Sequence, residues 1–149
     1  MSMPTPFAGS RNYPNATRTG FSSMANVNAT GRRKGEPKHV RQYEWMLACP
    51  AYRSLSCPAR CLLVELGRRY NGHNNGNIPL SVREAANLLG TGKNQAMRAF
   101  RDLEDRGFIR PHIKGAFTLK ARHATTWILA EFGYRGERPS KDFMKWKPG

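Results

Sequence analysis

One helix-forming stretch, residues 93–106, carries the side chains best suited to chemistry. Its apolar residues recur at the i, i+3, i+4 and i+7 spacing of a buried helical face: Ala96, Ala99, Phe100 and Leu103. The opposite face then consists of Lys93, Asn94, Gln95, Met97, Arg98 and Arg101. Arginine and lysine bind the guanine edge in the major groove of DNA, whereas asparagine and glutamine bind adenine. This face is therefore predicted to recognise base pairs.

The residues before this stretch predict a second helix and a tight turn. Ser81 followed by Glu84 is typical of a capping box that starts a helix. Gly90 ends that helix, and Gly90-Thr91-Gly92 makes the turn before residue 93. Helix-turn-helix domains consist of these elements and insert the second helix into the major groove. A solvated polar face is the alternative interpretation, because every surface helix has one.

The position of each side chain along the second helix predicts its partner. The first two turns enter the groove in this motif. The expected base contacts are therefore Asn94, Gln95 and Arg98. The expected phosphate contacts on this helix are Lys93 and Arg101. Three acidic residues at its far end are expected to point away from DNA or to form i,i+4 ion pairs with arginines: Asp102, Glu104 and Asp105.

A β-hairpin is predicted after this helix, with strands over residues 108–113 and 125–129. A turn is expected at 114–116, with the loop continuing beyond it, and the region between Arg106 and Ala130 contains no acidic residue. The expected phosphate contacts of this hairpin are Lys114, Lys120 and Arg122. A solvated basic hairpin is the alternative. Together these elements predict a mainly α fold with a small β-hairpin wing, a winged helix-turn-helix.

Two further helices are predicted upstream. The first covers residues 42–49 and ends at Pro50, because the residue before a proline resists helical geometry. Ser56 is predicted to cap the second, over residues 57–70. The Asn- and Gly-rich residues 71–77 predict a surface loop.

The two ends of the chain differ from this central domain, which is expected over residues 39–132. Residues 1–38 are rich in Asn, Thr, Ser, Gly and Pro and lack apolar periodicity, so a disordered basic arm is expected. The arm's expected contacts with the DNA backbone are Arg32, Arg33 and Lys34. Residues 133–149 form a basic, aromatic tail that is expected to pack on the domain through Phe143 and Trp146.

Net charge is the strongest constraint from composition. The 149 residues carry a formal charge of +15, with a pI near 10.6, which implies an anionic partner such as double-stranded DNA. No run approaches the about 18 apolar residues of a membrane span, and residues 1–20 lack the apolar core of a secretory signal. The three cysteines follow no disulfide-scaffold pattern. A cytoplasmic, nucleoid-associated protein without membrane contact is expected.

An enzyme, a cofactor or a metal site is not expected. None of the four histidines stands at a motif spacing from a carboxylate or a cysteine. Cys57 and Cys61 are spaced i,i+4 and could share a metal with Cys49 or a histidine, but a paired-cysteine zinc pattern is lacking. The loop over residues 71–77 lacks the Lys-Ser end of a phosphate-binding loop.

Two segments carry a family resemblance. Residues 80–90 (LSVREAANLLG) and 93–109 (KNQAMRAFRDLEDRGFI) resemble bacterial winged helix-turn-helix proteins of the MarR and GntR types. Three further segments resemble a narrower group of small bacterial helix-turn-helix proteins: Pro50–Leu55, Arg68–Gly72 and Arg122–Thr125. That group has replication-initiator-like and phage-like relatives. The resemblance covers about residues 42–129 and implies the fold and DNA binding. Gly92 departs from it, because the family usually has a serine or threonine cap there.

A transcriptional regulator is the expected role, and the sequence leaves other roles open. One alternative is a replication or recombination accessory protein of a mobile element; another is a basic RNA-binding or assembly protein. Groove recognition predicts a sequence preference in duplex DNA, whereas shape-driven RNA binding predicts a preference for structured RNA. A winged helix that only contacts proteins predicts neither. A homodimer is compatible with the sequence, which contains no ligand-sensing domain of the GntR type.

Overall fold

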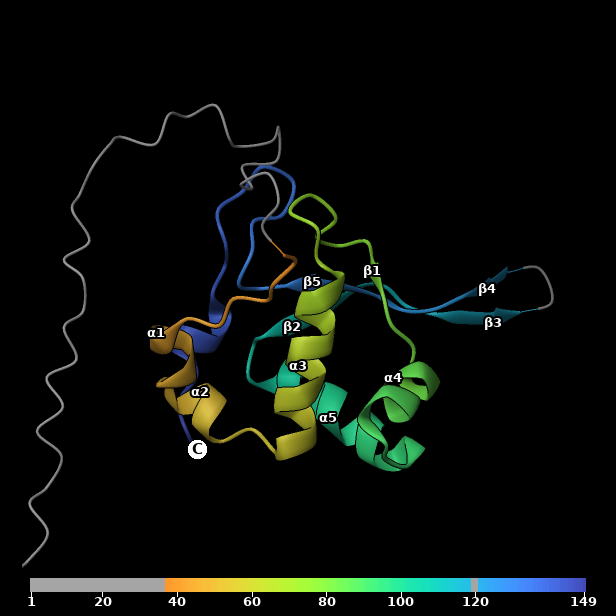
Figure 1. The fold of residues 1–149 in the computed structure, drawn as a ribbon, viewed down its shortest axis with the longest axis horizontal. Helices are drawn as coiled ribbons and strands as arrows, with labels where there is room; N and C mark the ends of the chain where they lie inside the picture. The colour runs from red at the N-terminus through yellow and green to blue at the C-terminus, as the bar shows by residue number, and fades with distance from the viewer. Residues whose placement is uncertain (1–36, 119–120) are drawn as a thin grey trace, which may run out of the picture. The chain divides into compact units, whose positions relative to one another are not determined.

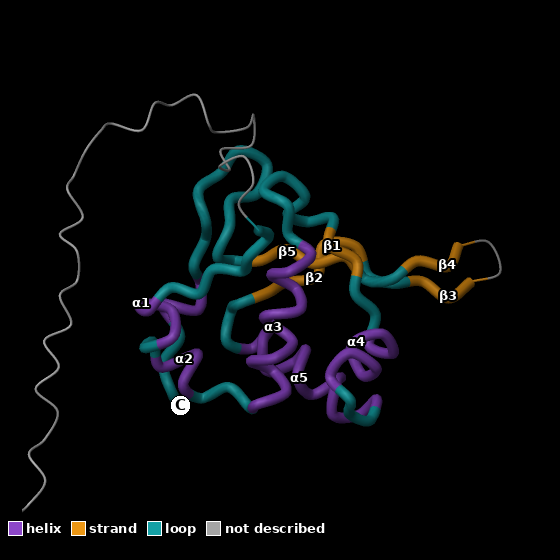
Figure 2. Tube along the Cα trace, in the orientation of Figure 1, coloured by secondary structure: helices purple, strands orange, loops and turns teal. Residues whose placement is uncertain are grey.

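The computed structural model describes the backbone of residues 37–118 and 121–149, and the side chains of these residues outside 117–122. Its helices are α1 (Glu44–Leu47), α2 (Pro50–Arg53), α3 (Cys57–Arg69), α4 (Val82–Leu89), α5 (Lys93–Asp105) and the 3-10 helix η2 (Asp142–Lys145) (Figure 1). Its strands are β1 (Ile78–Pro79), β2 (Ile109–Ile113), β3 (Ala116–Thr118), β4 (Ala121–His123) and β5 (Thr126–Leu129) (Figure 2). The fold is thus mixed α/β rather than mainly α, because two small sheets accompany the five α-helices of the described part.

Local capping sets the ends of α3 and α4, two of the three longer helices. The Ser56 hydroxyl accepts a hydrogen bond from the Ala59 amide at the start of α3. Ser81 caps α4 in the same way through the Glu84 amide, and Gly90 ends α4 in the left-handed conformation, with φ of 63°. All three helices lie within a residue or two of their predicted bounds. The predicted capping box is corrected in one respect: the Glu84 carboxylate pairs with Arg69.

The predicted helix over residues 42–49 is wrong in its extent. α1 covers only Glu44–Leu47, and a second short helix, α2, follows it. Pro50 occupies the first turn of α2, where its fixed φ is favourable and its missing amide hydrogen costs nothing. The thiol of Cys49 caps α2 by accepting from the Tyr52 amide at 3.4 Å. Pro50 therefore starts a helix as well as following one.

The main sheet has the antiparallel strand order β1-β5-β2, and Trp127 of β5 joins it to the helices. Trp127 pairs with Ile78 across β1, and its ring stacks on Phe100 of α5 with centroids 4.7 Å apart. Its indole Nε1–H donates to the Leu80 carbonyl at 3.0 Å. This side chain is 5% exposed and belongs to the hydrophobic core.

Beyond the main sheet lies the separate strand pair β3–β4 (Figure 1), and residues 114–118 and 121–125 are called here the wing. The predicted turn at 114–116 is wrong, because Ala116 begins β3 and pairs with His123. The joint with the main sheet depends on side chains: the Thr125 hydroxyl accepts from the Gly115 amide at 2.9 Å. A Cβ on Gly115 would lie 3.0 Å from the Thr125 nitrogen, so only glycine fits this joint without movement.

The C-terminal residues belong to the same compact unit, which spans residues 37–149. Phe143 of η2 is fully buried, and the Trp146 ring lies against the Arg106 guanidinium. The Lys141 amide donates to the Ala130 carbonyl at 3.0 Å. The expectation that this segment packs through Phe143 and Trp146 is confirmed.

The arm expected over residues 1–38 lies outside the described residues, apart from its last two positions. Within the described part, every helix is too short or too polar to cross a membrane.

Candidate nucleic-acid interface

The two faces of α5 divide as the sequence predicts. Ala96, Ala99, Phe100 and Leu103 are buried, each with 3% exposure or less. The opposite side, called here the outer face of α5, is formed by Lys93, Asn94, Gln95, Met97, Arg98 and Arg101. All of these side chains are exposed except Met97, which is half-buried. The cationic and amide side chains therefore lie on one accessible surface.

Contacts with two other helices and the main sheet hold α5 in place. α3 and α4 both pack against it. Ala96 and Ala99 have no exposed surface, and such small side chains let neighbouring helices approach closely. Phe100 anchors the middle of α5 on Trp127 of the sheet. The outer face is thus carried by an element whose inner face is fully packed, so little reorganisation is needed to present it to a ligand.

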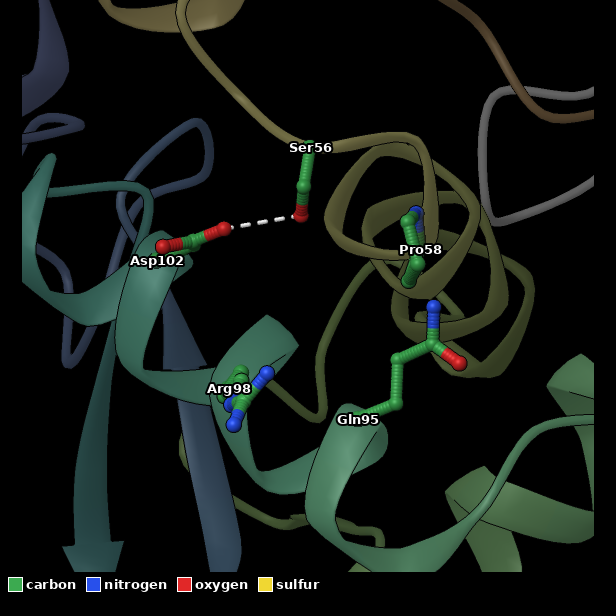
Figure 3. A pocket seen from close by; sticks show the side chains of 5 residues that line it. All are labelled: Ser56, Pro58, Gln95, Arg98 and Asp102. Atoms are coloured by element: carbon green, nitrogen blue, oxygen red, sulfur yellow. Dashed lines mark hydrogen bonds between the residues drawn. The ribbon is translucent and has the colours of Figure 1, made fainter.

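Two shallow depressions share Arg98 along this surface. One is lined by Asn94, Met97, Arg98 and Arg101. The other, of about 310 Å³, is lined by Ser56, Pro58, Gln95, Arg98 and Asp102 (Figure 3). The structure therefore brings Asn94, Arg98 and Arg101 together. Gln95 lies instead beside the start of α3, so the three expected base contacts do not form a single cluster.

The polar groups of the outer face are largely unpaired. Among the described residues, Lys93, Asn94, Gln95 and Arg98 make no side-chain hydrogen bond or ion pair. Arg101 makes only a long contact, at 3.8 Å, with the Met97 sulfur. These donors are on exposed or half-buried side chains, so a ligand can bind them without first breaking interactions within the described part of the chain.

One of the three acidic residues at the end of α5, Asp102, does not lie as predicted. Asp102 does not simply point away, because it lines the same depression as Arg98 and Gln95. It accepts a hydrogen bond from the Ser56 hydroxyl at 2.7 Å and pairs with Arg106 at 3.4 Å, as its i,i+4 spacing allowed. Sequence reasoning identified Ser56 only as a helix cap and so missed its second role. No local sequence pattern could have indicated the hydrogen bond between Ser56 and Asp102, because the two residues are 46 positions apart.

Partial burial raises the pKa of the Glu104 carboxyl, and the neighbouring Asp105 charge raises it further. Lys114 and Arg101 act in the opposite direction. A cation at the base of the wing and a cation of the outer face are thus both within electrostatic reach of this carboxylate.

The predicted cations of the wing and the arm are only partly covered by the structure. Lys114 is exposed at the base of the wing, where its carbonyl lies 3.1 Å from Nε2 of His123. The remaining predicted phosphate contacts fall outside the described residues or side chains: Lys120, Arg122, Arg32, Arg33 and Lys34.

The cysteines do not gather with other metal ligands. Within residues 37–118 and 121–149, no group of three or more His, Cys, Asp or Glu side chains is placed to hold a metal ion. Cys49 is buried at the start of α2, while Cys57 and Cys61 are exposed and free.

Comparison with protein-family models, with curated proteins and with solved structures gave no match to this chain. The outer face of α5 and the high positive charge of the chain are therefore the features that bear on its function.

Proposed function

We propose that this protein binds double-stranded DNA in a sequence-selective manner as a winged helix-turn-helix, with α4, the turn over residues 90–92 and α5 as the helix-turn-helix. The observation that carries the proposal is the outer face of α5. It combines exposed guanidinium, ammonium and amide donors, unpaired among the described residues, on a firmly packed helix, and these are the groups that bind base edges and phosphates.

Dimensions and charge support this interpretation. An α-helix with its side chains is about 10–12 Å across and fits the major groove, which is about 12 Å wide. Asn94 and Arg98 lie in the first two turns of α5, the part that enters the groove in such motifs. The net charge of +15 adds an attraction to phosphate that does not depend on sequence.

Transcription regulation is the role we propose, because the resemblance of residues 80–109 is to bacterial regulators. The nucleoid is then the site of action. Replication or recombination on a mobile element would use the same interface.

Selection of bound duplexes from a random pool, followed by competition assays, tests the proposal. We expect an enriched sequence that binds at least about tenfold more tightly than its scrambled version at 150 mM salt, within the usual range of specific over non-specific binding. A structured RNA of equal length should compete no better than scrambled DNA. Preference for that RNA over every duplex would favour the RNA-binding alternative, and an absence of binding to either would contradict the proposal.

A further inference from the structure

Asp102 has an arginine on each side of it along α5, and the structure pairs it with only one of them. Arg98 and Arg106 stand four residues before and after it, and both spacings permit an ion pair on a helix. The Asp102 Oδ1 atom lies 3.4 Å from a guanidinium nitrogen of Arg106. Oδ2 accepts the Ser56 hydroxyl at 2.7 Å (Figure 3). Arg98 lines the same depression and has no polar partner among the described residues.

Asp102 pairs with Arg106 and not with Arg98 because residues outside α5 hold the Arg106 side chain in place. Its Nε donates to the Ser54 hydroxyl at 2.7 Å, and a terminal nitrogen donates to the Ser54 carbonyl at 3.2 Å. Its guanidinium carbon lies 5.3 Å from the centre of the Trp146 ring. Arg106 is thus fixed between the α2–α3 connection and the C-terminal segment, whereas Arg98 projects freely from the helix.

We infer that Arg106 and Ser56 hold the Asp102 carboxylate on their side of the helix and so keep the Arg98 guanidinium free for DNA. The inference rests on the proposed function and makes Arg106 a positioning residue rather than a DNA contact. Without Arg106, the carboxylate would be free to pair with Arg98. It would then compete with the ligand for that cation and would add an unneutralised negative charge near the phosphates.

A rescue experiment separates this effect from a general structural one. In Arg106→Met, affinity for the selected duplex should fall about five- to tenfold, the scale expected for one uncompensated charge near a phosphate. In the double variant Arg106→Met/Asp102→Asn, affinity should return to within about twofold of Asp102→Asn alone. A loss caused by weakened folding would remain in the double variant, because the amide restores no contact to Ser54 or Trp146. Absence of rescue would overturn the inference.

Two further variants keep the test decisive. Asp102→Asn alone should change affinity by less than about twofold, since this carboxylate is already neutralised; a large gain would show that it pairs with Arg98 in solution and overturn the inference without any change to Arg106. Arg68→Met is the matched control, because it also removes an arginine that pairs with a carboxylate on its own helix, that of Glu65. This ion pair lies at the end of α3 opposite Ser56. Arg68→Met should lower affinity by less than about twofold.

A readout in the free protein distinguishes failure of this inference from failure of the proposed function. The NMR signal of the Arg98 guanidinium Nε–H should shift in Arg106→Met and return in the double variant. If the signal behaves in this way but no duplex binds, the ion-pair arrangement holds and the proposed function is wrong. If duplex binds and the Arg98 signal is unchanged in Arg106→Met, this inference is wrong and the proposed function stands.

Discussion

The ring of Phe143 lies flat against the ring of Phe108, with centroids 4.6 Å apart and planes 7° apart. Phe108 stands between α5 and β2, so a residue near the C-terminus closes the core just beyond the end of the proposed recognition helix. Gly107 makes this approach possible. It has a φ of 79°, and a Cβ there would lie 3.0 Å from the backbone of Asp142 and Phe143.

Phe143→Ala should therefore destabilise the whole domain. Removing a fully buried phenyl ring leaves a cavity and should cost about 3–5 kcal/mol of unfolding free energy. Urea denaturation followed by circular dichroism measures it. Met144→Ala is the control, because the neighbouring Met144 is 47% exposed, and it should cost less than about 0.5 kcal/mol. Equal small losses in both variants would show that η2 is not part of the cooperative fold.

Arg98→Ala and Arg101→Ala should have different effects on DNA binding. Arg98→Ala should cost about 1–3 kcal/mol on the selected duplex and relax the preference at one base position. Arg101→Ala should weaken binding to every sequence and reduce the slope of log K against log salt by roughly 0.9, as expected when one phosphate is no longer neutralised. Fluorescence anisotropy on selected and scrambled duplexes measures both. Equal affinity of Arg98→Ala and the unchanged protein for both duplexes would rule out the groove assignment.

Sequence predicted those parts of the fold that depend on neighbouring residues. Ser56, Ser81 and Gly90 set the ends of α3 and α4 because each caps its own helix through adjacent backbone groups. The apolar spacing on α5 correctly separated its buried and exposed faces, because that spacing follows from helical geometry alone.

Features set by distant contacts could not be predicted in this way. The position of the wing turn depends on the Thr125 hydroxyl bonding to Gly115 across the hairpin. The partner of Asp102 likewise depends on Ser56, which approaches it from another helix. Two arginines stand at a helical spacing that permits an ion pair with that carboxylate, so spacing alone does not predict which of them pairs with it. The displacement of Gln95 toward α3 has the same origin, since it depends on how α3 and α5 pack.

Glu131→Gln should stabilise the protein at neutral pH. One carboxylate oxygen of Glu131 is buried without a hydrogen-bond partner among the described residues, and this burial raises its pKa, with Lys141 acting in the opposite direction. A raised pKa in the folded state means that this carboxyl favours folding below its ordinary value of about 4.3. That contribution is lost as the pH rises through the folded-state pKa.

The melting temperature of Glu131→Gln should therefore exceed that of the unchanged protein at pH 7, with the difference shrinking toward pH 4. Thermal melts across this range measure it. Glu137→Gln, at an exposed position, serves as the control and should show no such trend. A difference for Glu131→Gln that stays constant with pH would contradict the assigned cause.

Removal of residues 1–36 should leave the melting temperature nearly unchanged. Residues 37–149 form a compact unit of their own, and the sequence of the removed segment lacks apolar periodicity. DNA affinity should fall several-fold, and more at low salt than at high salt, because the removed cations act through screened attraction. A thermal melt and a salt titration of both proteins measure these effects. Unchanged affinity at every salt concentration would show that the arm makes no contact with DNA.

Neutralising the wing should weaken binding to every duplex without changing which sequence is preferred. The triple variant Lys114→Gln/Lys120→Gln/Arg122→Gln removes three cations from a hairpin whose base is held by the Thr125 hydroxyl, which accepts from the Gly115 amide. Phosphate contacts position a protein on DNA but carry no base information. The slope of log K against log salt should therefore flatten by roughly 0.9 for each phosphate that the wing no longer neutralises, while the preference over scrambled DNA persists.

A charge-matched triple variant separates local contacts in the wing from the reduction in net charge. Arg68→Gln/Arg135→Gln/Arg138→Gln removes the same charge from exposed positions on α3 and on the loop after β5. It should leave the salt slope nearly unchanged, because counterion release depends on cations that touch phosphate rather than on total charge. Circular dichroism should show both variants folded. If the two triple variants flatten the slope equally, the wing contributes only to the overall field of the protein and does not lie against the DNA backbone.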